Sequence, residues 1–144
     1  MAIYPNVSNE KLVVDIKRLL RQLTKNQSAI NNFNRGVLNR ILFGGNGHIA
    51  VIKRKDKVIA MGTVFIVQTS LKRLALIEDV VVDKKYRGRG LGKTIVQALI
   101  QRAKDFHADC IDLTSHPSRI EANSLYRHLG FEKRDTNCYR LKSS

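Results

Sequence analysis

The sequence predicts an α/β domain with a mixed, mostly antiparallel sheet and helices on both of its faces. Apolar residues recur at helical spacing near the N-terminus, and three β-rich runs with short polar turns follow them. A strand, a long helix and another strand come next, an order that forms a parallel crossover within one sheet. The chain has only two prolines and no repeat or linker, so we expect residues 1–144 to form a single domain.

Two helices are expected in the N-terminal part of the chain. Ser8 is a suitable N-cap for the first helix, whose apolar residues recur at helical spacing to about Lys25. A second helical pattern covers residues 33–42 and stops at Gly44-Gly45. Both helices are therefore available to cover the sheet.

The rest of the chain predicts a hairpin, a crossover unit and a final pair of strands. Strands are expected at residues 48–53, 57–68, 74–83, 109–114, 131–134 and 137–141, with a hairpin turn at residues 54–56. A long helix is expected at residues 90–107 and a short one at residues 119–129, closed by Gly130.

The chain is strongly basic. Its 26 Lys and Arg residues face 12 Asp and Glu residues, and the net charge of +14 favours polyanionic partners: nucleic acid, an anionic membrane or a phosphate-rich small molecule. No stretch approaches the roughly 18 apolar residues of a membrane span, and no signal peptide is recognisable, so we expect a cytoplasmic protein without membrane contact. Cys110 and Cys138 lie in strand-like runs and are expected to be core thiols.

A glycine-rich turn over residues 87–94 precedes the long helix and resembles three phosphate-binding patterns. The dinucleotide pattern G-x-G-x-x-G fails because its third glycine falls on Lys93, and the Walker A pattern fails because its first glycine falls on Arg87. The pattern R-x-x-G-x-G fits without exception at Arg87, Gly90 and Gly92. A basic strand-to-helix turn that binds no ligand is the alternative interpretation.

Such a turn suits a pyrophosphate for two physical reasons. Glycines allow close approach of the backbone, and the unpaired N–H groups of Gly88 to Gly92 lie at a helix N-terminus, where the helix dipole favours negative charge. Cations that could attend a further phosphate lie within the same ten residues: Lys84, Lys85, Arg87, Arg89 and Lys93.

Two segments resemble a known superfamily. Residues 77–83 and 86–92, Ile-Glu-Asp-Val-Val-Val-Asp and Tyr-Arg-Gly-Arg-Gly-Leu-Gly, look like motif A of the GNAT superfamily of acetyl-CoA-dependent N-acetyltransferases. Residues 121–131, with Tyr126 followed by Gly130-Phe131, resemble its motif B. The order of elements is similar over the whole chain, so the resemblance implies the GNAT fold, in which the parallel strand pair splays apart.

The resemblance also implies a site for acetyl-CoA. The pantetheine arm would enter the gap between the splayed strands and pair with backbone near Val80 and Val82, as an added strand would. The glycine turn would hold the pyrophosphate. The implied cofactor-binding residues are Val80, Val81, Val82, Arg87, Gly88, Arg89, Gly90, Leu91, Gly92, Lys93, Asn123 and Tyr126.

Two catalytic residues are implied in the same way. Tyr126 matches the tyrosine that protonates the departing CoA thiolate, and Glu78 matches a strand glutamate that deprotonates the incoming ammonium, directly or through water. The alternatives are a tyrosine that only packs on Phe131 and a glutamate held in a structural ion pair. Strand alternation sends Glu78 and Asp79 to opposite faces of the sheet, and Asp79 is expected to be structural. We expect direct transfer in a ternary complex, since Cys110 lies too deep in a strand to be a nucleophile.

The acceptor is an amine that the sequence does not identify. The stretch Ile77-Glu78-Asp79 resembles glucosamine-6-phosphate N-acetyltransferases, and the positive charge suits a phosphorylated amino sugar; a protein amine is the alternative. The rival function is nucleic-acid binding by a retained fold, which the few aromatic residues disfavour. The histidines have no metal-ligand spacing, so no metal site is expected, and the oligomeric state is left open, a homodimer included.

Overall fold

The computed structural model describes residues 1–143, and these form two compact units, Met1–Thr114 and the segment that begins at Ser115. The first unit contains α1 (Glu10–Leu23), α2 (Gln27–Asn32), α3 (Arg35–Phe43), β1 (Gly47–Arg54), β2 (Lys57–Gln68), β3 (Arg73–Val82), the 3₁₀ turn η1 (Lys84–Tyr86), α4 (Leu91–Asp105) and β4 (Cys110–Leu113). The second unit contains α5 (Ile120–His128). No helix within residues 1–143 is long and apolar enough to cross a membrane.

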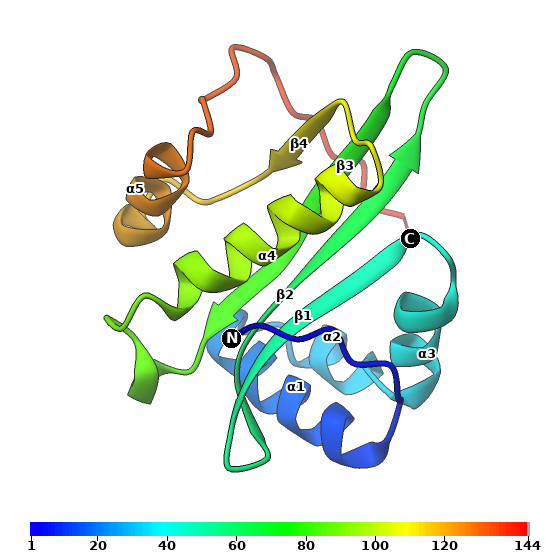
Figure 1. Ribbon diagram of the computed structural model, residues 1–144, viewed down its shortest axis with the longest axis vertical. Coiled ribbons are helices and arrows are strands. Elements are labelled where there is room, and N and C mark those ends of the chain that lie inside the picture. The colour runs from blue at the N-terminus through cyan, green and yellow to red at the C-terminus, as the bar shows by residue number, and fades with distance from the viewer. Residues whose placement is uncertain (144) are drawn as a thin grey trace. The chain divides into compact units, whose positions relative to one another are not determined.

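The first unit is built on one mixed sheet in the order β1-β2-β3-β4 (Figure 1). The strands β1, β2 and β3 are antiparallel neighbours, whereas β4 pairs in parallel with β3 over Leu74–Ile77 only. The chain reaches β4 through the long helix α4, which gives the parallel crossover that the sequence predicts. The predicted mixed α/β fold with a parallel strand pair is therefore confirmed.

Helices cover the sheet from both sides. Apolar residues of α1, including Leu12, Ile16 and Leu19, pack with α3 and with one face of β1, β2 and β3. The helix α4 packs on β2 and β3, and a Cβ atom at Gly62 would lie 2.7 Å from Ile95 and 2.8 Å from Leu99 of this helix. A side chain at position 62 would therefore force Ile95 and Leu99 to shift, so glycine allows the close packing of α4 on the sheet.

The β1–β2 hairpin turns at Lys55 and Asp56, as predicted. Both residues have positive φ angles, 49° and 62°, which match the twist of the flanking strands in a two-residue hairpin loop. The ladder begins at the pair Arg54 and Lys57 and runs to Gly47 and Phe65.

The N-terminal helices differ from the expectation in two details. The N-cap of α1 is Asn9, whose Oδ1 accepts the N–H of Leu12 at 2.8 Å, so the expected cap Ser8 lies one residue too early. The six-residue helix α2 was not expected, because it is shorter than the window that reveals helical periodicity. Its N-cap is Asn26, which accepts the N–H of Ala29.

The second unit holds a helix and an extended tail. Helix α5 lies within the predicted range, and Gly130 follows it with a φ angle of 92°. The predicted strands at 131–134 and 137–141 are wrong, because residues 131–143 contain no strand and most of them are exposed. Alternating residues form a strand only when another strand supplies the hydrogen-bond ladder. Cys138 is accordingly exposed rather than in a core, while Cys110 is half-buried in β4, and both thiols are free.

Candidate functional site

A β-bulge interrupts β3 at Asp79. Glu78 pairs with Thr63 and Val81 pairs with Met61, so two residues, Asp79 and Val80, lie opposite the single residue Gly62. Asp79 adopts a left-handed conformation with a φ angle of 54°, which is the conformation that inserts the extra residue. The bulge changes which backbone groups face each edge of β3.

Beyond the bulge, the backbone of Val80 and Val82 faces the outer edge of β3. The N–H of Asp83 donates to the carbonyl of Ile59 on β2 at 2.8 Å, so by alternation Val81 also faces β2. No strand of the Met1–Thr114 unit pairs with the outer edge after Ile77, because the pairing with β4 ends there. This edge is open to an added strand, whereas the backbone of Val81 is engaged and its side chain lies in the core.

The open edge leads into the glycine turn. Gly88 and Gly90 have φ angles of 75° and 77°, and a Cβ atom at either position would meet nothing within 4 Å. Gly90 is the N-cap of α4 and provides no side-chain cap, so among the described residues the first N–H groups of this 15-residue helix have no side-chain acceptor. Leu91, Gly92 and Lys93 form that first turn. An anion would be stabilised there.

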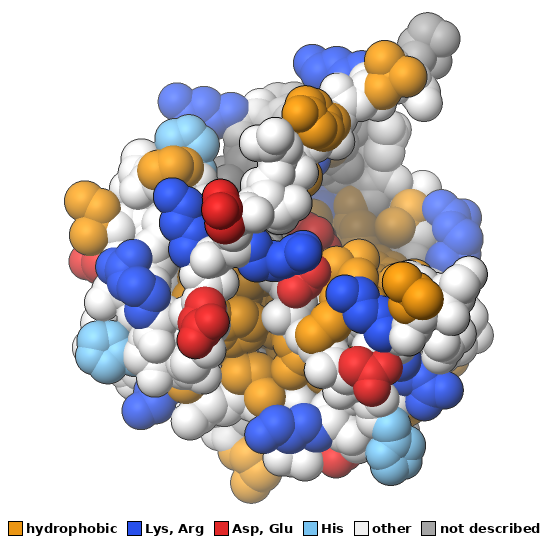
Figure 2. Space-filling view, turned by 90° about the horizontal axis from the view of Figure 1, so that it is seen from above, with side chains coloured by type: hydrophobic (Ala, Val, Ile, Leu, Met, Phe, Trp, Pro, Cys, Tyr) orange, Lys and Arg blue, Asp and Glu red, His pale blue; other side chains and the backbone are white. Residues whose placement is uncertain are grey.

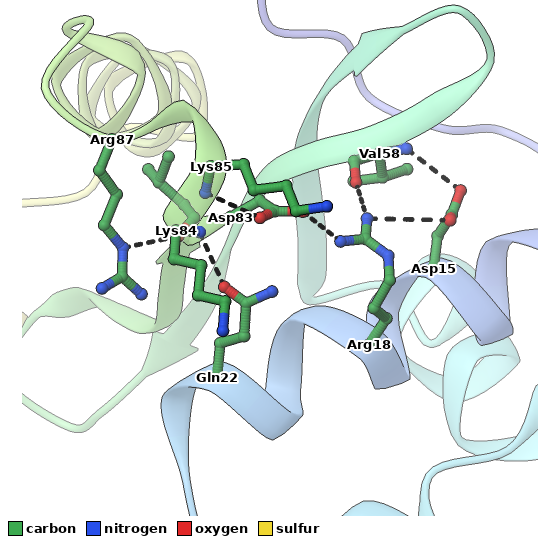
Figure 3. Close-up of polar contacts among 9 residues, drawn as sticks. Asp15, Arg18, Gln22, Val58, Asp83, Lys84, Lys85 and Arg87 are labelled. Atoms are coloured by element: carbon green, nitrogen blue, oxygen red, sulfur yellow. Dashed lines mark hydrogen bonds and ion pairs between the residues drawn. The ribbon is translucent and has the colours of Figure 1, made fainter.

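Contacts from α1 hold the chain at the end of β3 (Figure 3). The guanidinium group of Arg18 donates to the Asp83 carboxylate and to the carbonyl of Val58, and the side chain of Gln22 accepts the N–H of Lys84 at 2.8 Å. Burial alone would raise the pKa of Asp83, but the N–H of Lys85, the Arg18 guanidinium and Gln22 together lower this pKa. These contacts fix the start of the glycine turn.

The basic side chains of the turn are held in part by local contacts. The Nε of Arg87 donates to the carbonyl of Val82 at 3.0 Å, on the open edge of β3. The guanidinium groups of Arg54 and Arg89 lie 5.6 and 5.5 Å from the ring centre of Tyr86. Elsewhere Lys and Arg side chains are scattered, with Asp and Glu among them on the face shown in Figure 2, so this face carries no single basic patch.

The bulge also determines where the two strand carboxylates point. Glu78 is exposed and lies directly opposite Thr63, so the two side chains share a face of the sheet. Asp79 lines a cavity together with Thr63, on that same face. The expectation that alternation sends Glu78 and Asp79 to opposite faces is therefore wrong, because the left-handed backbone at Asp79 breaks the alternation.

The cavity lies between α1, α2, α3 and the sheet and measures about 480 Å³. Most of its lining is apolar and includes Ile16, Leu20, Leu23, Ile30, Ile49 and Met61. Two of its polar residues serve the backbone: Asn26 caps α2, and the Oγ1 of Thr24 accepts the N–H of Asn26 at 3.2 Å. The volume and the apolar lining are those of a small-molecule site.

Asp79 is the charged residue of this lining among the described residues. Within residues 1–143 no hydrogen bond or ion pair reaches its carboxylate, whereas Glu78 has an interaction partner. Asp79 is exposed to solvent, but the surrounding protein removes part of its hydration, and this desolvation raises the pKa of Asp79. A cation entering the cavity would compensate for the lost hydration.

The second unit holds the two predicted residues of motif B. Tyr126 is buried, and its ring lies edge-on to Phe131 with ring centres 6.0 Å apart. Burial raises the pKa of Tyr126 despite the opposing effect of Arg119, so the phenol stays protonated at neutral pH. The Nδ2 of Asn123 donates to the carbonyl of His116 at 2.9 Å, which ties its amide to the loop before α5.

Two features of the site were not found from the sequence. Arg18 and its contacts with Asp83 join residues 65 positions apart, and sequence periodicity gives no sign of such a pair. Asp79, which lines the cavity, was expected to be structural, although two adjacent carboxylates in an apolar strand were a signal that regular alternation fails at Asp79. Among residues 1–143, no group of three His, Cys, Asp or Glu side chains could hold a metal ion.

Comparisons with known proteins find relatives among N-acetyltransferases. The glucosamine 6-phosphate N-acetyltransferase of Arabidopsis thaliana is 35% identical over 105 residues, covering 65% of this chain and 70% of that protein. A crystal structure of glucosamine-6-phosphate N-acetyltransferase from the same plant has a TM-score of 0.77, with 25% identity and 99% of each chain covered. The Bacillus subtilis protein YobR, an uncharacterized N-acetyltransferase, is 28% identical over 88 residues, covering 61% of this chain.

The chain spans only 34% of the length of YobR, so that similarity concerns one part of the relative. A model of the Acetyltransferase (GNAT) family matches residues 15–131, which include the bulge, the glycine turn and Tyr126. The chain therefore belongs to the GNAT family of acetyl-CoA-dependent N-acetyltransferases, as the resemblance of its two motifs implies.

Proposed function

We propose that this protein moves the acetyl group of acetyl-CoA directly to a primary amine, in a ternary complex and without an acyl-enzyme intermediate. One observation carries the proposal: the open outer edge of β3 leads into an uncapped helix N-terminus. The outward N–H and carbonyl groups of Val80 and the outward N–H of Val82 can pair with the amides of pantetheine, while the Val82 carbonyl accepts from Arg87. The N–H groups from Gly88 to Lys93, with Arg87 and Arg89 beside them, can hold the pyrophosphate.

The chemistry needs a base, an oxyanion donor and an acid. The amine nitrogen attacks the thioester carbonyl carbon after losing a proton, which Glu78 takes directly or through water. The outward N–H of Val80 stabilises the oxyanion of the tetrahedral intermediate. As this intermediate collapses, the C–S bond breaks and Tyr126 donates its proton to the departing thiolate. The phenol of Tyr126 is protonated at neutral pH and so carries the proton that this step transfers.

A phosphorylated amino sugar is one acceptor within this proposal. The net charge of +14 and the names of the two Arabidopsis thaliana proteins support it. Its phosphate would require cations near the amine, such as those of the glycine turn. A lysine or the amino terminus of another protein is the alternative acceptor.

Binding of acetyl-CoA tests the donor half of the proposal. Acetyl-CoA should raise the Tm of the protein, because a ligand that binds only the folded state stabilises it by mass action. At a concentration of 100 Kd the free energy of unfolding should rise by about 2.7 kcal/mol. Gly90→Val should abolish this shift, because its branched side chain would stand where the pyrophosphate approaches. Gly45→Val is a matched control, since Gly45 also has a positive φ angle and open space around its Cβ position. A normal acetyl-CoA shift in Gly90→Val would contradict the assignment of the turn.

The proposed proton donor can be tested by removing one oxygen atom. Tyr126→Phe should lower kcat by roughly 10–1000-fold while acetyl-CoA binding survives, since the ring packing on Phe131 is kept. Steady-state rates of CoA release measure kcat, and the acetyl-CoA thermal shift measures donor binding. Normal turnover would mean that the thiolate leaves without help from Tyr126.

The proposed base gives a different pH profile. Glu78→Gln should lower kcat at neutral pH, where the acceptor is an ammonium ion, and the defect should shrink at high pH, where the free amine prevails. The Tyr126→Phe defect should not recover in this way. A Glu78→Gln variant with full activity at neutral pH would assign the base to water or to another residue.

A further inference from the structure

The cavity on the α1 face of the sheet indicates the chemical class of the acceptor, an inference that rests on the proposed acetyl transfer. We propose that this cavity is the acceptor site and that it takes a small apolar primary amine, such as an arylalkylamine or a short alkylamine, with the ammonium group on the Asp79 carboxylate.

The size and lining of the cavity favour an apolar ligand body. Its volume of about 480 Å³ lies within the range of small-molecule sites. Ile16, Leu20 and Leu23 of α1 form one wall, and Ile49 and Met61 of the sheet form another. A sugar bearing several hydroxyl groups would lose hydrogen bonds to water against such walls and find few partners in return.

The charge inside the cavity favours a single positive group. Among the lining residues that the structure describes there is no Lys or Arg, so a phosphate in the cavity would meet no cation and would face the Asp79 carboxylate. An ammonium group would instead pair with this carboxylate and donate hydrogen bonds to it. The raised pKa of Asp79 in the absence of a partner points the same way, since its charge is desolvated and uncompensated.

The position of Asp79 connects the cavity with the donor edge. Asp79 is the bulged residue, and Val80, whose backbone faces the outer edge of β3, follows it directly. An amine held by Asp79 would therefore lie one residue from the backbone that we assign to the thioester. Glu78, on the other side of Asp79, shares its face of the sheet and can receive the proton that the amine loses. Asp79 would bind the ammonium and Glu78 would deprotonate it.

Initial rates with three probe amines test this inference. We would measure CoA release at saturating acetyl-CoA with 2-phenylethylamine, glucosamine 6-phosphate and a lysine-containing peptide. We expect 2-phenylethylamine to have the highest kcat/KM. Asp79→Asn should lower this value by about 10–100-fold, mainly through KM, because a hydrogen bond to a charged group is lost. The alcohol 2-phenylethanol, which lacks the ammonium group, should compete less well than a tertiary amine of the same shape.

Two further variants separate binding from folding. Asp56→Asn makes the same chemical change at another left-handed residue, in the β1–β2 turn, and should leave the kinetics unchanged. Ala29→Phe places a ring on the cavity lining and should lower kcat/KM for 2-phenylethylamine, while the acetyl-CoA thermal shift stays normal.

The outcomes distinguish this inference from the proposed function. Turnover of glucosamine 6-phosphate or of the peptide, with 2-phenylethylamine ignored, would overturn the apolar acceptor while acetyl transfer stands. An Asp79→Asn variant with unchanged KM for 2-phenylethylamine would overturn the role of Asp79. A lack of turnover with all three amines would overturn the acceptor inference, and only the additional loss of the acetyl-CoA thermal shift would overturn the proposed function as well.

Discussion

Asp79 and Asp83 lie four residues apart at the end of β3, and the fold treats their charges in opposite ways. Asp83 is 4% exposed and is paired with Arg18, Gln22 and the N–H of Lys85, which together lower its pKa. Asp79 lines an apolar cavity, has no hydrogen bond or ion pair within residues 1–143, and has a raised pKa. One carboxylate stabilises the folded chain, and the other is left for a ligand.

The difference shows how stability and function are divided along one strand. A buried carboxylate with several donors fixes the chain, and the contacts of Asp83 fix the start of the glycine turn. A desolvated carboxylate without donors destabilises the folded state, and such a residue is expected where binding needs it. The bulge at Asp79 separates the two environments, because it places Asp79 on the cavity lining while β3 continues to Val82, directly before Asp83.

The largest stability effect is expected at Asp83. Asp83→Asn should destabilise the protein by about 1–3 kcal/mol at pH 7, because it removes charged hydrogen bonds and leaves the Arg18 guanidinium with only the more distant Asp15 carboxylate, 3.9 Å away. Because folding lowers the pKa of Asp83, its contribution is present above the unfolded pKa and is lost as pH falls through the lower folded value. The difference in Tm between Asp83→Asn and the unmodified protein should therefore shrink in acid.

A double-mutant cycle with Arg18 checks the cause of that effect. Arg18→Met and Asp83→Asn should each lower the Tm, and the double variant should lose less stability than the two single losses added together. Additive losses would place the stabilising role of Asp83 in its contacts with Gln22 and with the N–H of Lys85 instead.

The sequence predicts the sheet, helix α4 and the glycine turn better than it predicts the cavity. Helix α4, the β1–β2 hairpin and the glycine turn follow from apolar periodicity, from a two-residue polar turn and from the pattern at Arg87, Gly90 and Gly92. These signals are local. The cavity depends on α2, which is too short to show periodicity, and on a left-handed residue that interrupts an otherwise regular strand.

The two final strands were predicted wrongly, because a local pattern was present but a pairing partner was not. Residues 131–134 and 137–141 have a strand-like pattern, but the structure of residues 131–143 gives them no ladder partner, and a pattern alone does not make a strand. The bulge was missed because regular strand alternation was applied to Glu78 and Asp79. Their adjacency in an apolar strand signals an exception without saying which of the two carboxylates enters the cavity.

The smallest and most discriminating effect is expected at Asp79. Asp79→Asn should raise the Tm at pH 7, because it removes a desolvated charge that has no partner among the described residues. Folding raises the pKa of Asp79, so the ionised carboxylate destabilises the protein above the folded pKa, and this penalty disappears as pH falls below the unfolded pKa of about 3.9. The gain in Tm should therefore shrink as pH falls through the folded pKa and vanish below the unfolded pKa, where the carboxylate is protonated in both states.

Asparagine also tolerates a left-handed backbone well, and this property could raise the Tm without any electrostatic effect. Asp56→Asn isolates it, since Asp56 has a φ angle of 62° and lies in the exposed β1–β2 turn, outside the cavity lining. A gain in Tm at Asp79 that exceeds the gain at Asp56, and that fades in acid, would assign the difference to the desolvated charge. Equal gains at all pH values would mean that Asp79 is strained but well hydrated, and the contrast with Asp83 would then be one of backbone conformation rather than of charge.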